Sequence, residues 1–556
     1  MSAAASAGSS TRSIIWFRKA LRIHDNPALA AGIANAKSAQ PVFVLDPWFC
    51  KPSRVGPNRM RFLLQSLSDL DASLRDVGSS LLVLHGEPRV VLPRACKSWK
   101  VDLVTWEHDI EPYAKMRDGA VRGALERAGV ECASPSGHTL YDVDEFLSKC
   151  GKGGPPTTYQ GFLKVMDKMG TPAKPIDAPT KMPAPFSLSL EETGDLVQGV
   201  ADGYGIPNLE DLGYETLADD EGFPARGGET EGLKRLRKQL ARKEWVGKFE
   251  KPNTSPTTLF HGLDVAKPKP KSPFEIAAGI KSEDMKMGPD VFMTPSTTAL
   301  SPYMKFGCVS PRVFYHELNG VLAELGGKHS KPPVSLMGQL LWREFYYVVG
   351  AGTPNFDKME GNPICRQIPW NKDKELFAAW ENAQTGYPWI DAAMTQLRLE
   401  GWLHHLARHA VACFLTRGDL FVHWEWGRDV FDRDLVDADW ALNNGNWMWL
   451  SCSAFFYQYF RVYGPHSFAK KYDKEGEYVK HYLPVLRNMP AKYIYEPWLA
   501  PIEVQRKAGC VVGVDYPSPV VEHAVASKAC IEKIANAYAA HKDTNAKTGV
   551  KRARGD

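Results

Sequence analysis

The stretch GWLHHLARHAVACFL, at positions 401–415, predicts a helix that lies inside a helical domain. Between Trp402 and Leu415 only four residues are not apolar, namely His404, His405, Arg408 and His409. A helix that is apolar nearly all round has no face for water, so we expect it in the interior. His405 and His409 are four residues apart and share one face of this helix, with Arg408 near the same stripe.

The polar side chains of this face have more than one interpretation. The histidines are either core residues that their neighbours satisfy or groups that face a ligand. The metalloprotease zinc pattern needs Glu directly after the first histidine, but Leu406 stands there, and we predict no metal site. Arg408 cannot lose its charge, so its burial requires an anion.

Candidate partners for Arg408 lie in DLVDADWALNNGNWMWL at 434–450. Asp437 and Asp439 are two residues apart, and Asn443 comes four residues after Asp439. Either aspartate alone also fits a helix cap. Together with Arg408 the cluster predicts a buried polar set that faces a ligand with its own donors and acceptors.

A third element is TTALSPYMKFGCVSPR at 297–312, where Thr297, Thr298 and Ser301 precede Pro302 and a helical run. Hydroxyls and free backbone N–H groups at the start of a helix suit an anion such as a diphosphate. An ordinary helix cap is the alternative.

The first 140 residues alternate between two patterns. Helical stretches separate four short β-rich runs, which are SIIWF (13–17), PVFVLD (41–46), SLLVLHG (80–86) and VDLVTWE (101–107). This alternation predicts βαβ crossovers and a parallel sheet. A helix-poor connector rich in Pro and Gly follows, and the chain is helical and aromatic from about 228 onward.

We therefore divide the chain into six parts. They are a disordered N-terminus (1–12), an α/β domain (13–140), a connector (141–227), a helical domain (228–500) with a polar insertion near 257–293, a helical segment (501–538) and a disordered basic tail (539–556).

The composition is that of a globular protein and excludes several classes. Of the 556 residues 44% are hydrophobic and 24% are charged, and the net charge is +4. A nucleic-acid site must therefore be a local patch. No apolar run is long enough for a membrane span, and the first 12 residues do not fit a secretory signal. The ten scattered cysteines contain no C-x-x-C pair and indicate buried thiols in a reducing compartment.

Several long segments carry a family resemblance. They are QLLWREFYY (339–347), GNPICRQIPW (361–370), GYPWIDAAMTQLRLEGWLHHLARHAVACFLTRGDL (386–420), DADWALNNGNWMWLSCSAFFYQYFRVY (437–463) and YLPVLRNMPAKYIYEPW (482–498). These segments resemble the photolyase/cryptochrome flavoproteins, and the match runs from IIWFRKALRIHDNPAL to about Tyr538.

The resemblance implies a Rossmann-like parallel-sheet domain, a connector and a C-terminal helical domain that holds FAD. It implies that Asp437 pairs with Arg408 and that Asn443 faces the flavin. The whole set of implied FAD-binding residues is Lys251, Thr297, Thr298, Ala299, Leu300, Ser301, Gln339, Trp342, Arg343, His405, Arg408, Asp437, Ala438, Asp439 and Asn443.

The histidines narrow the resemblance to one branch. Photolyases for cyclobutane dimers have Asn and Met where His405 and His409 stand, so the pair is similar to (6-4) photolyases and animal-type cryptochromes. The resemblance implies light-driven repair of (6-4) photoproducts in UV-damaged DNA, by electron transfer from excited, reduced FAD to a flipped-out lesion. A signalling cryptochrome without repair activity is the alternative, one protein can do both, and cyclobutane-dimer repair is less favoured.

The resemblance also implies roles in the reaction. His405 is the expected proton donor and His409 its partner, a pair expected to titrate near neutral pH. Gln339, Trp342 and Tyr463 are expected to hold the flipped bases together with the two histidines. Trp447, Trp424 and Trp370 match the electron-transfer chain of the family, and Phe421 stands where animal-type members often have a fourth Trp.

Further expectations concern cofactors, partners and location. A second, antenna chromophore is expected in the N-terminal domain, with a deazaflavin and a folate as alternatives. We expect a monomer that binds damaged DNA and no membrane, with transcription-factor partners if the protein also signals. The basic VKRARGD at the end of the chain suggests import into the nucleus, with a chloroplast or another organelle as the alternative.

Overall fold

In a computed structural model, the described residues are 11–188, 205–215, 217, 222–254 and 296–548. The sheet of the N-terminal domain is parallel throughout, with strand order β3-β2-β1-β4-β5. Its strands are β1 (Thr11–Phe17), β2 (Ala36–Leu45), β3 (Leu82–His85), β4 (Leu103–Thr105) and β5 (Glu131–Ala133). Four of these strands were predicted, whereas the three-residue β5 was not.

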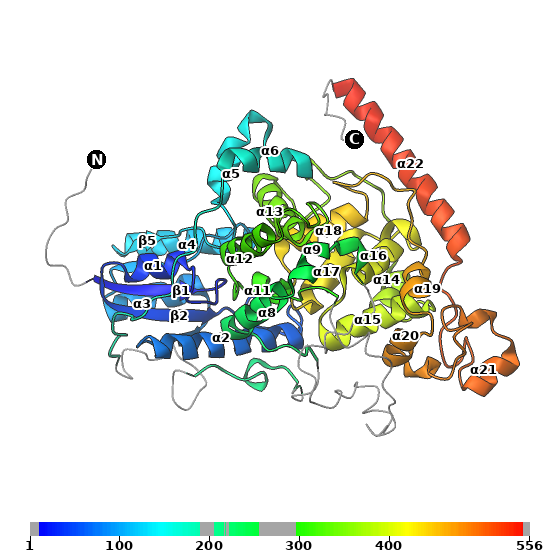
Figure 1. Cartoon of the computed structure of the whole chain (residues 1–556), viewed down its shortest axis with the longest axis horizontal. Coiled ribbons are helices and arrows are strands. Elements are labelled where there is room, and N and C mark those ends of the chain that lie inside the picture. The colour runs from blue at the N-terminus through cyan, green and yellow to red at the C-terminus, as the bar shows by residue number, and fades with distance from the viewer. Residues whose placement is uncertain (1–10, 189–204, 216, 218–221, 255–295, 549–556) are drawn as a thin grey trace.

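Four helices connect the strands, and each has proline at its first position. They are α1 (Pro27–Ile33), α2 (Pro57–Asp76), α3 (Pro88–Trp99) and α4 (Pro112–Arg127). Proline at this position loses no helical hydrogen bond and already has the φ of a helix. The α/β fold class expected for this part of the chain is confirmed, and Figure 1 shows the helices beside the blue strands.

Alternate residues of β1 belong to different hydrophobic cores. Ile14 and Trp16 pack into a small core on one face of the sheet. Ile15 and Phe17 pack into the main core, which continues through the helical domain as far as Trp447. The sheet and the helical domain therefore share one core, which fixes the wall of the site relative to the sheet.

The connector is more helical than predicted. It contains α5 (Val143–Lys149), η1 (Gly151–Gly153), α6 (Tyr159–Met169) and η3 (Glu210–Leu212). Aromatic packing explains the difference, because the Phe146 and Phe162 rings stack at 5.3 Å and Tyr159 stacks on Trp342 at 4.4 Å. These contacts hold α5 and α6 in place and connect α6 to the helical domain.

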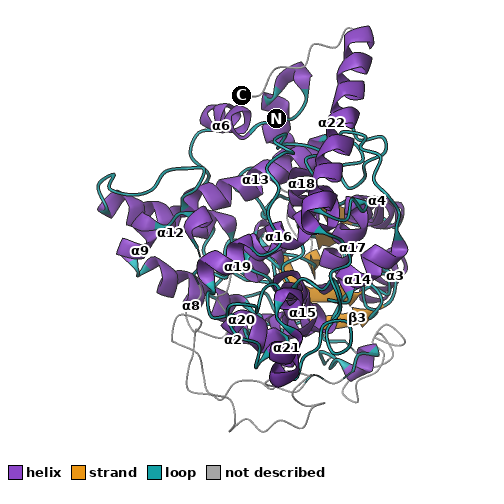
Figure 2. Cartoon of the chain, turned by 90° about the vertical axis from the view of Figure 1, so that its right-hand side faces the viewer, coloured by secondary structure: helices purple, strands orange, loops and turns teal. Residues whose placement is uncertain are grey.

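The helical domain surrounds the site, and Figure 2 shows that helices dominate the molecule outside the sheet. Its first helices are α8 (Glu229–Leu240), α9 (Lys243–Lys248), η4 (Lys251–Asn253), α11 (Ser301–Lys305), α12 (Pro311–Glu324), α13 (Leu336–Gly352), α14 (Lys374–Glu381) and α15 (Pro388–Glu400). They are followed by α16 (His405–Cys413), the π-helical η7 (Phe414–Gly418), α17 (Trp424–Asp434), α18 (Trp440–Leu450), α19 (Ser467–Tyr472) and α20 (Glu477–Tyr482). The insertion predicted near 257–293 lies outside the described residues.

The C-terminal part departs from the prediction. After η8 (Pro484–Leu486), η9 (Pro497–Leu499) and α21 (Ile502–Ala508), the last helix α22 spans His523–Thr548. It continues past 538, where the disordered tail was expected to begin, and its end extends away from the body (Figure 1). Burial of Cys530, Ile534 and Tyr538 anchors the helix as far as Tyr538.

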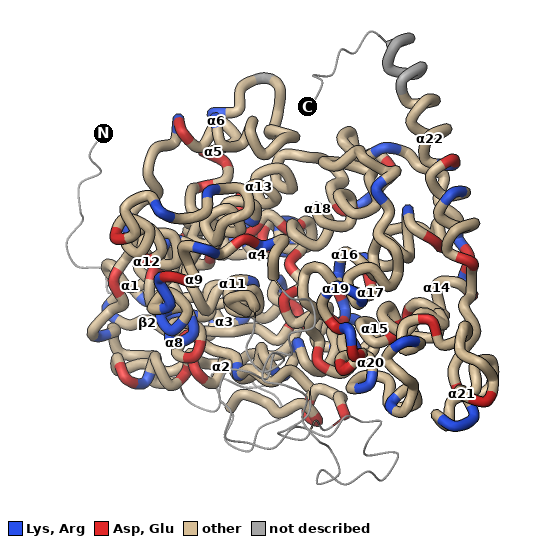
Figure 3. Tube along the Cα trace, turned by 45° about the vertical axis from the view of Figure 1, so that its right-hand side comes forward, with Lys and Arg blue, Asp and Glu red and all other residues tan. Residues whose placement is uncertain are grey.

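No helix in the part of the chain that the structure describes is long and apolar enough to span a membrane. Lys and Arg alternate with Asp and Glu along many of the elements (Figure 3), in line with the small net charge of +4.

Candidate functional site

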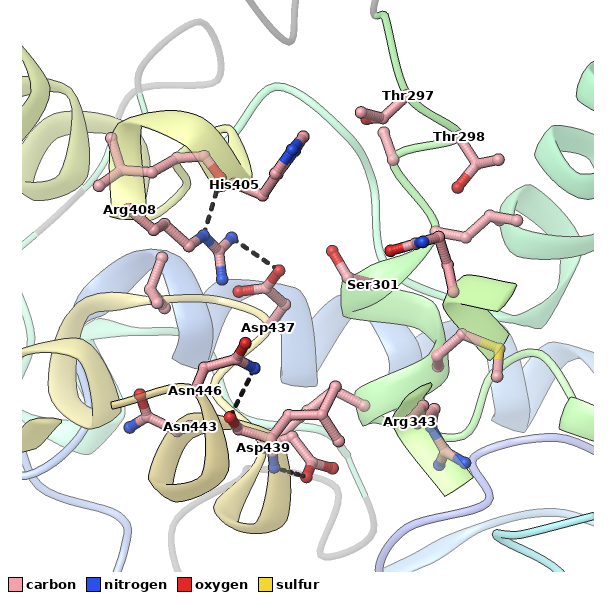
Figure 4. A pocket seen from close by; sticks show the side chains of 18 of the residues that line it. Thr297, Thr298, Ser301, Arg343, His405, Arg408, Asp437, Asp439, Asn443 and Asn446 are labelled. Carbon is pink, nitrogen blue, oxygen red and sulfur yellow. Dashed lines mark hydrogen bonds and ion pairs between the residues drawn. The ribbon is translucent and has the colours of Figure 1, made fainter. Parts of the chain in front are cut away.

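The site is a cavity of about 290 Å³ in the helical domain, the size class of small-molecule sites. Side chains of α13, α16 and α18 line it, together with the segment before α11. Figure 4 shows two opposing walls, one built from Thr297, Thr298 and Ser301 and the other from His405, Arg408, Asp437 and Asn443.

Arg408 has the anion that its burial requires. Its Nη2 donates to Asp437 Oδ2 at 2.8 Å, and its Nε donates to the Leu403 carbonyl at 2.9 Å. The side chain of Asp437 is 3% exposed and that of Arg408 is 23% exposed. The second carboxylate oxygen of Asp437, Oδ1, is buried and accepts no hydrogen bond from the described residues. It is therefore available to a ligand in the cavity.

Asp439 is both a helix cap and a cavity residue. Its Oδ1 accepts from the backbone N–H of Ala441 at 3.0 Å and of Leu442 at 3.2 Å, which caps α18. The Tyr347 hydroxyl donates to the other oxygen. Asp439 is thus a helix cap and a ligand-facing residue at the same time, because the cap fixes its carboxylate at the cavity wall.

Two asparagines of α18 line the cavity. Asn443 Nδ2 donates to the Arg428 carbonyl at 3.0 Å, which fixes the orientation of its amide. Asn446 donates to the Leu442 carbonyl at 2.8 Å and also lines the cavity. Asn446 was not predicted, although its position three residues after Asn443 places both on one helix face.

The opposite wall follows the predicted TTALS run. Thr297, Thr298, Ala299, Leu300 and Ser301 all line the cavity. Ala299 has a φ of 52°, a conformation that L-residues rarely adopt, and it turns the chain into α11. Hydroxyls therefore face the Arg408 wall across the cavity, as a phosphate-binding segment requires.

Three long polar side chains complete the wall, namely Lys251, Gln339 and Arg343. Burial, and then the charge of Arg408, lower the pKa of Lys251 to about 8. Gln339 donates to the Pro333 carbonyl at 3.1 Å. Arg343 pairs with Glu344 at 2.8 Å and donates to the His138 carbonyl at 2.7 Å, which joins the wall to the end of the α/β domain.

His405 and His409 meet edge to face, with ring centroids 5.7 Å apart, at the cavity wall. Burial lowers the pKa of His405 well below its ordinary value, and the nearby His404, Lys251, His409 and Arg408 lower it further. Burial also lowers the pKa of His409, to about 3, with Lys251 as the next cause. The expectation that the pair titrates near neutral pH is therefore wrong for the protein alone, without FAD or DNA.

Two of the predicted residues lie away from the cavity. Trp342 is not among the residues that line it, because its ring stacks on Tyr159 of the connector at 4.4 Å. Tyr463 does not line it either, but its ring lies 6.1 Å from that of His409, nearly parallel. The prediction that Trp342 lines the flavin pocket is corrected, since its half-buried ring stacks on Tyr159 of the connector helix α6 instead.

The expected electron-transfer tryptophans are buried. Trp447 lines the cavity, Trp424 has no exposed surface and Trp370 is 7% exposed. Their indole N–H groups have no hydrogen-bond partner among the described residues. By contrast, the Trp380 ring, 6.3 Å from Trp447, donates to the Val411 carbonyl at 3.0 Å, as a core tryptophan does.

Beyond Trp370, we find no fourth tryptophan that continues this series of electron-transfer residues in the part that the structure describes. The Phe421 ring lies 4.8 Å from Trp370. The ring of Trp426, the nearest candidate in sequence, packs on Phe377 at 5.2 Å. No ring contact joins Trp426 to Trp370 in the described part of the chain, so we do not assign it the missing position.

A second cavity, of about 130 Å³, lies in the α/β domain. Trp48 and Tyr113 stack at 3.6 Å at its wall, and the Arg54 guanidinium lies 3.5 Å from the Trp48 ring. Lys305 and Phe306, which follow the TTALS run, also line it. The flavin cavity and this second cavity are therefore only a few residues apart along the chain.

The residues present fit FAD in the larger cavity. The free Asp437 Oδ1 and the Asn443 and Asn446 amides match the donors and acceptors of a flavin ring. The threonine and serine hydroxyls and Lys251 match a diphosphate. No described group in the cavity excludes this assignment.

Comparison with known proteins agrees with this geometry. A family model for DNA photolyase matches residues 13–184, and one for the FAD-binding domain of DNA photolyase matches 336–536. A (6-4)DNA photolyase of Arabidopsis thaliana is 50% identical over 545 residues, which cover 96% of this chain and 90% of the relative.

A cryptochrome-1 of Gallus gallus is 47% identical over 526 residues, which cover 94% of this chain and 78% of the relative. Among solved structures, a cryptochrome of Synechocystis is similar with a TM-score of 0.77 and 26% identity, over 94% of this chain and 99% of that one. The chain therefore belongs to the DNA photolyase family of FAD-binding proteins, which includes the cryptochromes.

Proposed function

We propose that this protein repairs (6-4) photoproducts in UV-damaged DNA with the energy of light. The observation that carries the proposal is the pair His405 and His409, whose rings lie 5.7 Å apart at the wall of the FAD cavity. The 50% identity to a protein named (6-4)DNA photolyase supports it. A (6-4) lesion pairs poorly, so flipping it out of the duplex costs only about a few kcal/mol.

When bound and reduced, FAD supplies the light-excited electron that the repair requires. The Arg408–Asp437 pair and the capping of α18 by Asp439 hold the Arg408 wall of the cavity in place. His409, packed between His405 and Tyr463, orients the imidazole that gives the proton. Gln339, Trp342 and Tyr463 are the proposed contacts to the flipped bases.

Because the pKa values of His405 and His409 are lowered, we propose that DNA has a second role, which is to favour protonation of His405. In the protein alone, burial and the charges of Lys251 and Arg408 lower the pKa of both histidines and so oppose their protonation. DNA phosphates add negative charge near the cavity and raise the pKa of His405. A ring nitrogen of His405 then holds the proton that the lesion needs.

Light-driven repair and flavin photoreduction use different residues. We propose that Trp447, Trp424 and Trp370 carry the electron that reduces oxidised FAD. Trp447 alone of the three lines the cavity, so the chain starts there. We further propose that the second cavity binds an antenna chromophore, a deazaflavin or a folate.

We also propose that the protein acts in the nucleus as a monomer. The basic residues Lys551, Arg552 and Arg554 near the end of the sequence support nuclear import. Deletion of 540–556 in a tagged protein tests this, and unchanged nuclear entry would exclude the segment. A signalling role with transcription-factor partners is the second candidate, since the 47% identity to a cryptochrome favours it.

The deciding experiment is illumination of the purified, FAD-loaded protein with two oligonucleotides side by side. One carries a (6-4) photoproduct and the other a cyclobutane dimer, and samples kept in the dark are the control. We expect light-dependent loss of the (6-4) product alone. Repair of the dimer alone, or of neither, would contradict the proposal.

A further inference from the structure

His404, the residue before the expected proton donor, is the N-cap of α16. Its ring Nδ1 accepts the backbone N–H of Leu406 at 3.2 Å, and its carbonyl accepts the N–H of Arg408 at 3.0 Å. The side chain is buried, at 1% exposed. A nitrogen that accepts a hydrogen bond carries no hydrogen, so the ring hydrogen of neutral His404 lies on Nε2.

A buried threonine satisfies this hydrogen. Thr254 Oγ1 lies 3.0 Å from His404 Nε2 and donates its own hydrogen to the Lys251 carbonyl at 2.7 Å. Because the hydroxyl hydrogen is used in this way, Oγ1 must accept from Nε2. The hydrogen bonds therefore run in one direction, from His404 through Thr254 to the backbone of Lys251.

This series of hydrogen bonds prevents His404 from taking a second proton. Protonation would have to occur at Nδ1 and would break the cap on the Leu406 N–H. Burial lowers the pKa of His404 well below its ordinary value, and the charges of Lys251 and Arg408 lower it further. A charged His404 thus conflicts with the helix start and with both cations.

The ring of His404, with both nitrogens hydrogen-bonded, lies directly against His405, the expected proton donor. The His404 and His405 ring centroids are 4.3 Å apart, at an angle of 43°. A neighbouring imidazole that could exchange protons would compete with the lesion for the proton of His405. A neighbour with both nitrogens occupied cannot do so, and it also fixes the backbone from which His405 projects.

We propose that Thr254 and His404 are positioning residues, which confine the mobile proton of the site to His405 and His409. Through Thr254 the segment at Lys251, which lines the FAD cavity, is tied to the first turn of α16. The part of this inference that concerns repair rests on the proposed function, whereas the hydrogen-bonded state of His404 does not.

Thr254→Val and Thr254→Ser form a matched pair for the test. Valine has the shape of threonine without the hydroxyl, and serine keeps the hydroxyl without the methyl group. The first measurement is the 15N chemical shifts of the histidine rings in the FAD-loaded protein in the dark, with His404→Asn to assign the His404 signals. We expect the Nε2–H form of His404 in all three proteins, because the cap on the Leu406 N–H remains. The Nε2 shift should be that of a hydrogen-bonded N–H in the wild type and in Thr254→Ser, and that of an N–H without an acceptor in Thr254→Val.

The second measurement is the repair yield per photon and per bound (6-4) lesion as a function of pH. We expect Thr254→Val to lose about tenfold, a part of the ~10²–10⁴-fold that general acid catalysis contributes, and to show a shifted pH profile. Thr254→Ser should keep the wild-type profile. FAD absorbance and thermal melting show whether each variant is folded.

The outcomes separate this inference from the proposed function. If the wild type repairs no (6-4) lesion, the proposed function fails, while the dark 15N shifts still decide the state of His404. Wild-type 15N shifts of His404 in Thr254→Val would show that Thr254 does not accept the Nε2 hydrogen, and would overturn the inference. Equal losses of repair in Thr254→Val and Thr254→Ser, or none in either, would overturn the positioning role.

Discussion

Replacement of Asp437 by Asn tests whether the Arg408–Asp437 pair holds the flavin wall. The charged atoms lie 2.8 Å apart, which corresponds to an attraction of about 6 kcal/mol at an effective dielectric constant of about 20. Desolvation of both groups opposes this attraction, and breaking a buried pair costs about 3–5 kcal/mol in practice. Because Arg408 is 23% exposed, we expect the lower end, about 3 kcal/mol.

The variant also lacks the free carboxylate oxygen at the cavity wall, so FAD binding should weaken by about tenfold, as expected for ~1.4 kcal/mol. Denaturant titration of the FAD-free protein gives the loss of unfolding free energy, and flavin fluorescence gives the affinity. Asp434→Asn is the matched control, since Arg433 keeps a second partner, Glu381, at 2.9 Å. If both variants behave alike, the reasoning about the buried pair is refuted.

Four further results are expected. Trp447→Phe should greatly slow the photoreduction of oxidised FAD by an external reductant but spare repair by enzyme that is already reduced; equal loss of both would make Trp447 merely structural. His405→Ala should lower the (6-4) repair yield by about 10²–10⁴-fold with FAD retained, and His409→Ala should leave a trace of activity; wild-type yield in His405→Ala would identify core histidines. The unfolded chain protonates His409 below about pH 6.5, whereas the folded protein does so only at about pH 3. The free energy of unfolding should therefore fall by about 2 kcal/mol between about pH 6.5 and about pH 5. Denaturant titrations should find that His409→Asn removes this loss. Lesion binding should take up protons and weaken as pH rises, and calorimetry in two buffers should find no uptake in His405→Ala.

The sequence predicted those parts of the site that depend on short-range spacing. The alternation of strands and helices gave the parallel sheet, because each βαβ unit is specified locally. The uncompensated charge of Arg408 in an apolar helix predicted a buried anion, and Asp437 is that anion. The rule that a guanidinium stays charged required an anion but left Asp437 and Asp439 as candidates, and the family resemblance implied Asp437.

What the sequence could not give depends on tertiary packing. Trp342 sits in a motif that suggests a pocket residue, yet its ring stacks on Tyr159 of a connector helix far away in sequence. The pKa values of the histidines depend on Lys251, which lies more than 150 residues before them in the chain. The link from Thr254 to His404 joins the same two segments, and no local pattern marks it.

The apolar surroundings of the histidine helix have a functional consequence. A permanently charged histidine beside the flavin would be a proton donor at all times, with or without a lesion. Burial and the cations Lys251 and Arg408 instead lower the pKa of both His405 and His409 in the protein alone. Protonation of His405 therefore requires added negative charge near the cavity, and phosphate groups, those of bound FAD or those of damaged DNA, would supply it.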